Sequence, residues 1–181
     1  MIWIVIVFLL IVLLLIIIGY NQLIKFKNMV NDQWSQIDIL LKRRYDLIPN
    51  LVEIVKGYVK HEKETLEAVI NARNKATSSK SIDDSVSANN ELEGALSKLF
   101  ALSEAYPNLK ANTNFLDLQN NLKETEDKIS YARQFYNDSV LKYNNKVEMI
   151  PTNIIAILFG FKKYQFFEVT EEEKQAIKIK F

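Results

Sequence analysis

The stretch "RRYDLIPNLV", residues 43–52, lies between two helical patterns and carries a proline at position 49. A proline inside a helix costs about 3 kcal/mol, because it lacks the N–H and clashes with the preceding turn. In one reading, a helix ends near residue 45, Asp46 caps a new helix, and Pro49 lies in its first turn. In the other, one kinked helix continues in phase through Pro49. We predict the corner, because it lets four helices close into a bundle.

Apolar residues recur three and four positions apart along most of the chain, which is typical of amphipathic helices. With only four glycines and three prolines, few turns are available and long helices are favoured over short strands. The fold is therefore predicted to be all-α, an antiparallel up-and-down four-helix bundle of long helices over residues 21–150. The predicted helices are 21–45, 47–77, 90–106 and 113–150.

Polar punctuation separates these patterns. The stretch "TSSKSIDDSVSANN", residues 77–90, is poor in apolar residues and is predicted to be a loop or a frayed helix start. Asn90 with Glu93 has the spacing of a capping box, and so has Ser81 with Asp84. Asn112 or one of the two residues after it is expected to cap the last long helix.

The first 24 residues predict a transmembrane anchor. Residues 2–18 are an uninterrupted apolar run of about 17 residues, near the lower limit for a helix that spans a bilayer. Trp3 and Tyr20 lie where interfacial aromatic residues are found. A cleaved signal peptide would instead need a basic start, a shorter run and a small-residue cleavage site. Lys25 and Lys27 follow the run and no basic residue precedes it, so the C-terminal body is expected in the cytoplasm.

The tail, residues 151–181, begins with an apolar and aromatic stretch that is too short to span a bilayer. If the chain reverses three times, this stretch returns to the lipid surface, with its lysines near the headgroups. Alternatively, the same residues cap the end of the bundle core. The candidate membrane-surface residues are Ile154, Ile155, Leu158, Phe159, Phe161, Lys162 and Lys163.

Residues that carry chemistry are scarce. The chain has no cysteine, and His61 is its single histidine, whereas a di-iron bundle needs two Glu-x-x-His pairs. Glu62, Glu104 and Glu126 are more simply explained as a solvated face or as partners of arginines. The glycines are scattered singly, so no phosphate loop is present, and a net charge of +1 does not favour nucleic acid. We predict no enzyme, no metal and no cofactor.

Three Tyr-Asn pairs begin at Tyr20, Tyr136 and Tyr143. A buried tyrosine hydroxyl needs a hydrogen-bond partner, and an asparagine amide offers one. A structural role is therefore expected for all three pairs.

Three long segments together resemble the LemA family of bacterial membrane proteins. They are "YNQLIKFKNMVNDQWSQIDILLKRRYDLIPNLVEIVKGYVKHE" (20–62), "EAYPNLKANTNFLDLQNNLKETEDKISYARQFYNDSVLKYNN" (104–145) and "IPTNIIAILFGFKKYQFFEV" (150–169). The resemblance implies a single-pass protein of the bacterial inner membrane, with its N-terminus outside and a cytosolic helical bundle. It implies no catalytic residues. The matching positions retained as candidate interaction or structural residues are Trp34, Arg44, Asp46, Pro49, Asn50, His61, Glu62, Glu104, Arg133 and Tyr136.

The leading functional hypothesis is a membrane-anchored scaffold or adaptor that binds or organises protein partners at the cytoplasmic face. Its expected partners are the lipid bilayer, membrane or cytosolic proteins, and possibly further copies of itself, but not nucleic acid. The alternative is a ligand-sensing helical bundle that signals through its membrane helix, which would need a pocket between helices.

Overall fold

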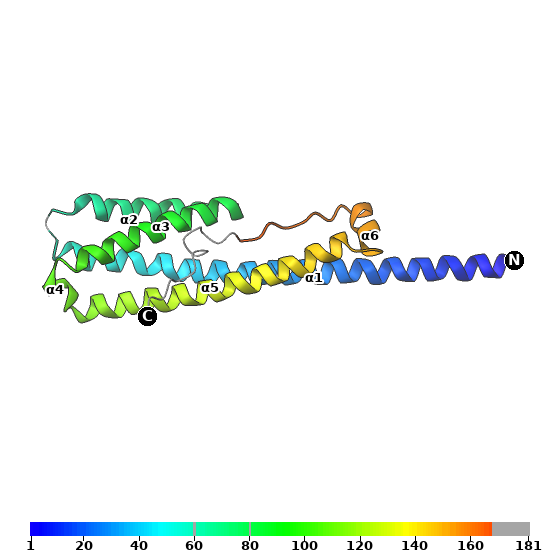
Figure 1. Ribbon diagram of the computed structural model, residues 1–181, viewed down its shortest axis with the longest axis horizontal. Helices are drawn as coiled ribbons and strands as arrows, with labels where there is room; N and C mark the ends of the chain where they lie inside the picture. Colours follow the sequence, from blue (N-terminus) through cyan, green and yellow to red (C-terminus); the bar gives the residue numbers. More distant parts are fainter. Residues whose placement is uncertain (60, 80, 168–181) are drawn as a thin grey trace, which may run out of the picture. The chain divides into compact units, whose positions relative to one another are not determined.

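The computed structural model describes residues 1–59, 61–79 and 81–167. Over these residues the chain forms helices, turns and loops, with no strand, so the predicted all-α class is confirmed. The helices are α1 (Ile2–Lys56), α2 (Lys63–Thr77), α3 (Ile82–Ser103), α4 (Pro107–Lys110), α5 (Thr113–Glu148) and α6 (Thr152–Leu158) (Figure 1). Part of the predicted tail, residues 168–181, lies outside the described residues.

The predicted corner at Pro49 is wrong. Helix α1 continues through Pro49 to Lys56, so the predicted helices 21–45 and 47–77 do not exist as separate elements. Asp46 caps nothing and instead forms an exposed i,i+4 ion pair with Lys42 at 2.8 Å. The helix survives the proline because the neighbouring residues Ile48 and Leu51 are fully buried. Burial of apolar side chains offsets the local cost of the proline.

Helix α3 begins eight residues earlier than the predicted helix 90–106. Ser81 is the N-cap, and its hydroxyl accepts a hydrogen bond from the Asp84 N–H at 3.1 Å, as the capping-box spacing predicts. Buried Ala88 and Leu92 then give this polar segment an apolar side that faces its neighbours. The polar composition of residues 77–90 favoured a loop or a frayed helix start, but most of the stretch is helical, and the outer face of α3 is solvated there.

The last long helix begins where a cap was expected. The Asn112 side chain accepts a hydrogen bond from the Phe115 N–H at 2.9 Å, just ahead of α5. Pro107 starts the short helix α4, because a proline in the first turn loses no helical bond. Helix α5 ends at Glu148, and α6 begins at Thr152.

The described chain divides into two compact units, to which α1 and α5 both contribute. Unit 2 comprises Asp38–Ser130. In it, α2 and α3 lie side by side (Figure 1). Buried apolar side chains from its long helical segments form its core, among them Leu51, Val69, Leu92, Leu99, Phe115 and Leu122.

Polar contacts also join the helices of unit 2. The buried Tyr45 hydroxyl donates to Asn89 Oδ1 at 3.0 Å, which ties α1 to α3. The buried Arg44 Nη1 lies 2.5 Å from Glu126 Oε2, which ties α1 to α5. Arg73 of α2 donates to the main-chain carbonyl of Tyr45 at 3.1 Å.

Unit 1 comprises Met1–Ile37 and Tyr131–Phe167. It holds the apolar start of α1, the C-terminal part of α5, helix α6 and the segment that follows α6. Val30, Ile37, Tyr136 and Val140 are fully buried in it. A smaller apolar cluster forms where Leu23 of α1 meets Ile155 and Ala156 of α6.

Candidate membrane-contact site

The stretch after α6, residues 162–167 (the docked segment), has no helix of its own and is held by side chains of α5. Asn144 brackets Tyr164: its Nδ2 donates to the Tyr164 carbonyl at 2.9 Å, and its Oδ1 accepts from the Tyr164 N–H at 3.0 Å. The Tyr143 hydroxyl donates to the Lys162 carbonyl at 3.0 Å. Burial raises the pKa of Tyr143, with nearby Tyr164 adding to the increase.

The second Tyr-Asn pair repeats the same contacts one heptad earlier. Asn137 brackets Phe167 through bonds of 3.0 Å to its carbonyl and 2.7 Å from its N–H. The Tyr136 hydroxyl donates to the Gln165 carbonyl at 3.1 Å. Both asparagines therefore bind main-chain groups of the docked segment, whereas the sequence analysis expected them to pair with tyrosine hydroxyls.

The spacing of the Tyr-Asn pairs along α5 matches the spacing of their partners along the docked segment. Seven residues of α-helix rise about 10 Å, and three residues of extended chain cover about 10 Å. The two tyrosines are seven residues apart on α5, and the carbonyls they bind, at 165 and 162, are three residues apart. The two asparagines are also seven residues apart, and their partners, 167 and 164, are three residues apart. These contacts fix where the chain after α6 lies on unit 1.

Helix α6 packs on α1 just after the apolar run. Gly19 is buried, and a Cβ at this position would lie against the movable end of Ile155, Cδ1, and near Thr152, so α6 packs closely on α1 here. Helix α6 ends in a Schellman motif: the Phe161 N–H binds the Ala156 carbonyl at 2.9 Å, and Gly160 has φ of 71°. This turn sends the chain back along α5.

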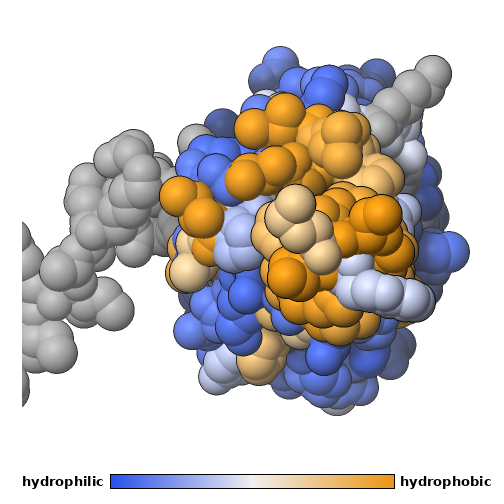
Figure 2. All heavy atoms as spheres, turned by 90° about the vertical axis from the view of Figure 1, so that its right-hand side faces the viewer, coloured by the Kyte–Doolittle hydropathy of each residue, from blue (hydrophilic) through white to orange (hydrophobic). Residues whose placement is uncertain are grey.

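The outer side of α6 is apolar and exposed. Ile154, Ile157 and Leu158 are 64%, 80% and 70% exposed, and Phe159 is 52% exposed. Viewed from the end at which α1 begins, apolar surface gathers around α1 and beside it (Figure 2). The residues of this apolar platform are Met149, Ile150, Ile154, Ile157, Leu158 and Phe159.

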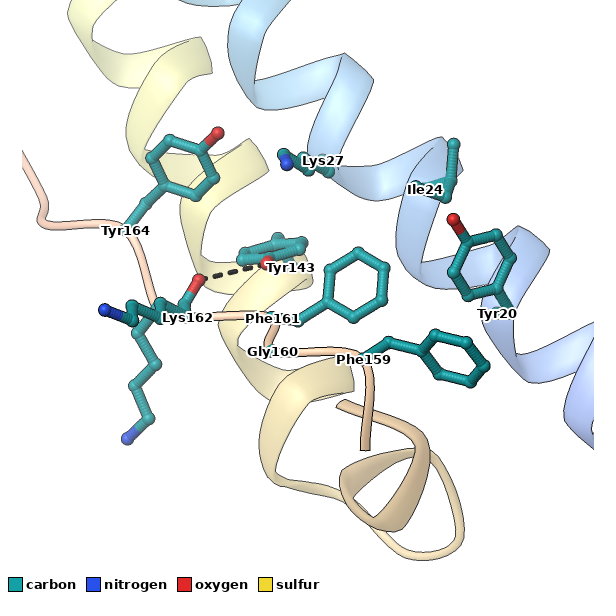
Figure 3. Close-up of a pocket in the computed structure, with 10 residues that line it drawn as sticks. Tyr20, Ile24, Lys27, Tyr143, Phe159, Gly160, Phe161, Lys162 and Tyr164 are labelled. Carbon is teal, nitrogen blue, oxygen red and sulfur yellow. Dashed lines mark hydrogen bonds between the residues drawn. The ribbon is translucent and has the colours of Figure 1, made fainter. Parts of the chain in front are cut away.

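A cavity of about 450 Å³ opens beside this platform, between α1, α5 and the chain after α6. Figure 3 shows the rings of Phe159 and Phe161 pointing toward α1. The dashed bond from Tyr143 to the Lys162 carbonyl lies on the side of the cavity away from α1. The Lys27 ammonium lies 6.0 Å from the centre of the Phe161 ring. The lining residues are Tyr20, Ile24, Lys27, Tyr143, Phe159, Gly160, Phe161, Lys162, Lys163 and Tyr164.

The predicted membrane-surface residues come together in this region, though not all on one face. Ile154, Leu158 and Phe159 are exposed, and Lys162 and Lys163 are exposed next to the cavity. Ile155, by contrast, is buried against α1, and Phe161 is half-buried. One side of α6 therefore covers the core, as one of the two readings of the tail expects, and its other side faces outward; contact of that side with lipid stays a prediction.

Several predicted motif residues lie in unit 1. The Trp34 ring meets the Tyr136 ring edge-on at 5.7 Å and the Phe167 ring at 6.4 Å. The Arg133 guanidinium lies over the Phe167 ring at 4.6 Å. Trp34, Arg133 and Tyr136 therefore surround the end of the docked segment, a grouping that sequence spacing did not reveal.

The remaining motif residues are scattered over unit 2. Pro49, Asn50 and His61 are exposed, as is Glu104, which pairs with exposed Lys110. Their positions give no common site.

Two carboxylates considered in the sequence analysis have other roles. The Tyr106 hydroxyl lies 3.4 Å from Glu62 Oε1, and burial, followed by the charge of Glu62, raises the Tyr106 pKa. Glu126 pairs with Arg44. Among the described residues, no group of three histidine or acidic side chains is placed to hold a metal ion.

Comparison with known proteins identifies the family. The sequence model of the LemA family matches residues 33–181. The chain belongs to the LemA family. This confirms the resemblance drawn from the three sequence segments.

Curated relatives extend the LemA match. Protein LemA of Metamycoplasma hominis is 27% identical over 161 residues, which cover 85% of this chain and 71% of that protein. Magnetosome protein MamQ of Magnetospirillum gryphiswaldense is 22% identical, covering 84% of this chain and 65% of its own length. Magnetosome protein MamQ 2 of Paramagnetospirillum magneticum is 32% identical over 74 residues. The chain spans only 27% of that last relative.

Proposed function

We propose that this LemA-family chain is a membrane-anchored helical scaffold or adaptor that binds or organises protein partners at the cytoplasmic face of a bacterial inner membrane. The observation that carries the proposal is the junction of α1 and α6. The apolar start of α1 is long enough to cross a membrane, and 6% of its most apolar window is buried. At its end, the apolar platform adds exposed hydrocarbon at the level where a bilayer would begin.

The apolar run of α1 and the apolar platform both indicate a membrane contact at the same end of unit 1. Contiguous exposed apolar surface on a protein in water is unfavourable and marks a contact with a partner or a membrane. Helix α6 is joined to α1 through Gly19 and Ile155, directly after the apolar run ends at Ile18. A membrane that surrounds residues 2–18 would therefore cover the platform as well.

The orientation rests on charge. Lys25 and Lys27 follow the apolar run on α1, and Lys162 and Lys163 follow α6 on the same unit. Lysines close to a membrane helix favour the cytoplasmic side. These four residues support an outside N-terminus and a cytoplasmic body.

Within the body, we assign unit 2 to an antiparallel bundle. The contact of Arg73 with Tyr45 joins residues about equally far from the turn between α1 and α2, as two antiparallel helices require. A rigid bundle with no evident catalytic set is suited to presenting surfaces to partners. Tyr131 and Phe135, one turn apart on α5, are 65% and 60% exposed and offer aromatic anchors for such a partner.

Membrane topology tests the first half of the proposal. The chain contains no cysteine, so single cysteines introduce unique labels. An impermeant maleimide should react with Ile2→Cys in intact spheroplasts, and with exposed Ser35→Cys only after permeabilisation. The reverse pattern would place the body outside. A polarity-sensitive dye on Ile157→Cys should shift to the blue in vesicles, whereas the same dye on Ser35→Cys should not.

Crosslinking in native membranes tests the scaffold half. We expect crosslinks from unit 1 to a partner protein or to a second copy, since an anchor concentrates weak partners in one plane. Tyr131→Ser combined with Phe135→Ser should remove them, while the matched change at exposed Ile39, Ile39→Ser, should not. Recovery of uncrosslinked monomer alone would contradict a scaffold.

One observation favours the alternative, a ligand-sensing bundle. Unit 2 contains a cavity of about 270 Å³ between α1, α3 and α5, with the buried Arg44 in its wall. Leu96, Phe100 and Leu122 give it an apolar part, and its other lining residues are polar or charged: Arg44, Glu93, Ser97, Gln119, Lys123 and Glu126. A thermal-shift screen of small metabolites on the full chain in detergent tests this function. A hit that is lost in Leu96→Trp, which fills the cavity, would support sensing.

A further inference from the structure

We propose that the cavity beside α6 binds the headgroup of an anionic phospholipid. This inference rests on the membrane anchoring proposed above and goes beyond it, because an anchor requires no particular lipid. The chemistry it names is a phosphate diester attached to acyl chains, recognised by a lysine and a tyrosine among aromatic rings.

The position along α1 is the first argument. The cavity is lined by Tyr20, Ile24 and Lys27, three residues on one face of the helix that begin directly after Gly19. From Tyr20 to Lys27 the helix rises about 10 Å. The headgroup layer of each leaflet is about 5–8 Å thick. A bilayer whose hydrocarbon ends near Ile18 therefore places its phosphates at the level of this cavity.

Available donors are the second argument. Tyr143 and Tyr164 use their hydroxyls within the protein, on the Lys162 carbonyl and on Asn31 Oδ1. Over residues 1–59, 61–79 and 81–167, by contrast, neither the Tyr20 hydroxyl nor the Lys27 ammonium makes a hydrogen bond or ion pair. Both groups line the same cavity, so one phosphate can accept from both.

Charge is the third argument. Lys163 is paired with Glu148, and the Lys162 side chain extends away from α1 (Figure 3). Lys27 is half-buried over the Phe161 ring, and among the residues that the structure describes no carboxylate lines the cavity. A half-buried ammonium without a counter-ion attracts an anion more strongly than an exposed one, because less water screens it.

The apolar surroundings identify the anion as a lipid rather than free phosphate. Phe159 belongs both to the cavity lining and to the apolar platform, so the cavity opens onto surface that acyl chains would cover. Lysine side chains on a helix lean toward its N-terminus, which directs Lys27 toward the bilayer. Tyrosine rings at this depth are typical of the membrane interface.

The test compares two lysines on the same helix. The full chain is placed in nanodiscs of phosphatidylcholine and phosphatidylglycerol, and native mass spectrometry after release counts the retained lipids. We expect wild type to retain phosphatidylglycerol preferentially. Lys27→Gln should lower that preference about tenfold, the effect of losing one charge-assisted hydrogen bond. Lys25→Gln, which changes an exposed lysine outside the cavity, should keep it.

Further variants exclude simpler explanations. Lys27→Arg should retain the preference, and Tyr20→Phe should weaken it without changing the net charge. Equal losses in Lys27→Gln and Lys25→Gln would show general surface attraction and overturn the site. Displacement of the lipid by inorganic phosphate alone would assign the cavity to free phosphate and overturn the lipid.

A second measurement distinguishes failure of the headgroup site from failure of the membrane anchor. Resistance of each variant to extraction from vesicles by alkaline carbonate reports anchoring alone. If wild type is extracted, the proposed function fails. If it stays in the membrane but retains both lipids equally, the anchor stands and the headgroup site is overturned.

Discussion

Arg73 Nε donates a hydrogen bond of 3.1 Å to the main-chain carbonyl of Tyr45, the carbonyl that Pro49 leaves without its helical partner. In an unbroken helix the N–H of residue 49 would bind this carbonyl, but proline has no N–H. A side chain from α2 thus supplies the donor that α1 lacks. This contact, together with the burial of Ile48 and Leu51, explains how a 55-residue helix tolerates an internal proline.

Removal of this donor should destabilise unit 2 in a way that depends on the proline. Arg73→Met leaves the Tyr45 carbonyl without its donor, and we expect a loss of about 1–3 kcal/mol in the free energy of unfolding. In a Pro49→Ala background, the restored N–H binds the carbonyl, so the same change should cost less. Chemical unfolding of the four variants in detergent, followed by circular dichroism, measures the coupling.

Lys75→Met is the matched control. It removes a second cation from α2, but its partner is Glu91 and both side chains are more than half exposed. Exposed ion pairs contribute about 0–1 kcal/mol, and Pro49→Ala should leave the Lys75 effect unchanged. Equal effects of Arg73→Met with and without the proline would show that the contact does not compensate for Pro49.

Periodicity and composition were sufficient for the all-α class, and local spacing placed Ser81 and Asn112 among the candidate caps without singling them out. These features depend on neighbours a few positions apart. The corner prediction failed because the donor that offsets Pro49 lies 28 residues from Tyr45, and no local rule includes it.

The docked segment was missed for a related reason. Asn137 and Asn144 bind main-chain N–H and C=O groups, which every residue has, so residues 162–167 carry no pattern that marks them as their target. The heptad between the two Tyr-Asn pairs was visible in the sequence. This heptad was the available signal, because two equivalent Tyr-Asn pairs on one face of a helix could have predicted a repeated contact with an extended chain.

Loss of one bracket should release the docked segment. Asn144→Ala removes both bonds to Tyr164, which together contribute about 1–3 kcal/mol. Trp34 contacts Phe167, so its fluorescence in a Trp3→Phe background reports docking. We expect a changed emission spectrum and faster proteolysis after Lys162. Asn145→Ala alters the next, exposed residue and should behave as wild type; an identical response of both variants would contradict the bracket.

The hydroxyl of Tyr143 should ionise at a higher pH than an ordinary tyrosine. Burial, with Tyr164 as a smaller cause, raises its pKa above the usual value of about 10. A raised folded pKa means that its contribution to stability is fully present below pH 10 and is lost as pH rises through the folded value. In a tyrosinate absorbance titration, Tyr143→Phe should remove a phenol that ionises above pH 10. A missing phenol that ionises at or below pH 10 would contradict the burial.

The pair of Arg44 and Glu126 should behave as a buried charge pair. Arg44 is 2% exposed and the Glu126 side chain 30% exposed, so Glu126→Leu removes the close partner of a buried cation. We expect a loss of about 3 kcal/mol, most of which returns when Arg44→Met is added. The exposed Glu124–Lys128 pair on the same helix is the control, and Glu124→Leu should cost much less than Glu126→Leu. Thermal unfolding of the wild type and of these three variants measures the losses.

The contact between α1 and α6 depends on the absence of a side chain at position 19. An alanine would meet only the mobile end of Ile155, but a leucine also reaches Thr152, so Gly19→Leu should push α6 away from α1. Overpacking of this kind costs about 1–3 kcal/mol. A disulfide between Leu23→Cys and Ala156→Cys, residues of one cluster, should form in the otherwise cysteine-free chain and fail to form with Gly19→Leu. Gly94→Leu, at a site with nothing within 4 Å, should leave the disulfide intact; a disulfide that forms equally well with Gly19→Leu would contradict the close approach.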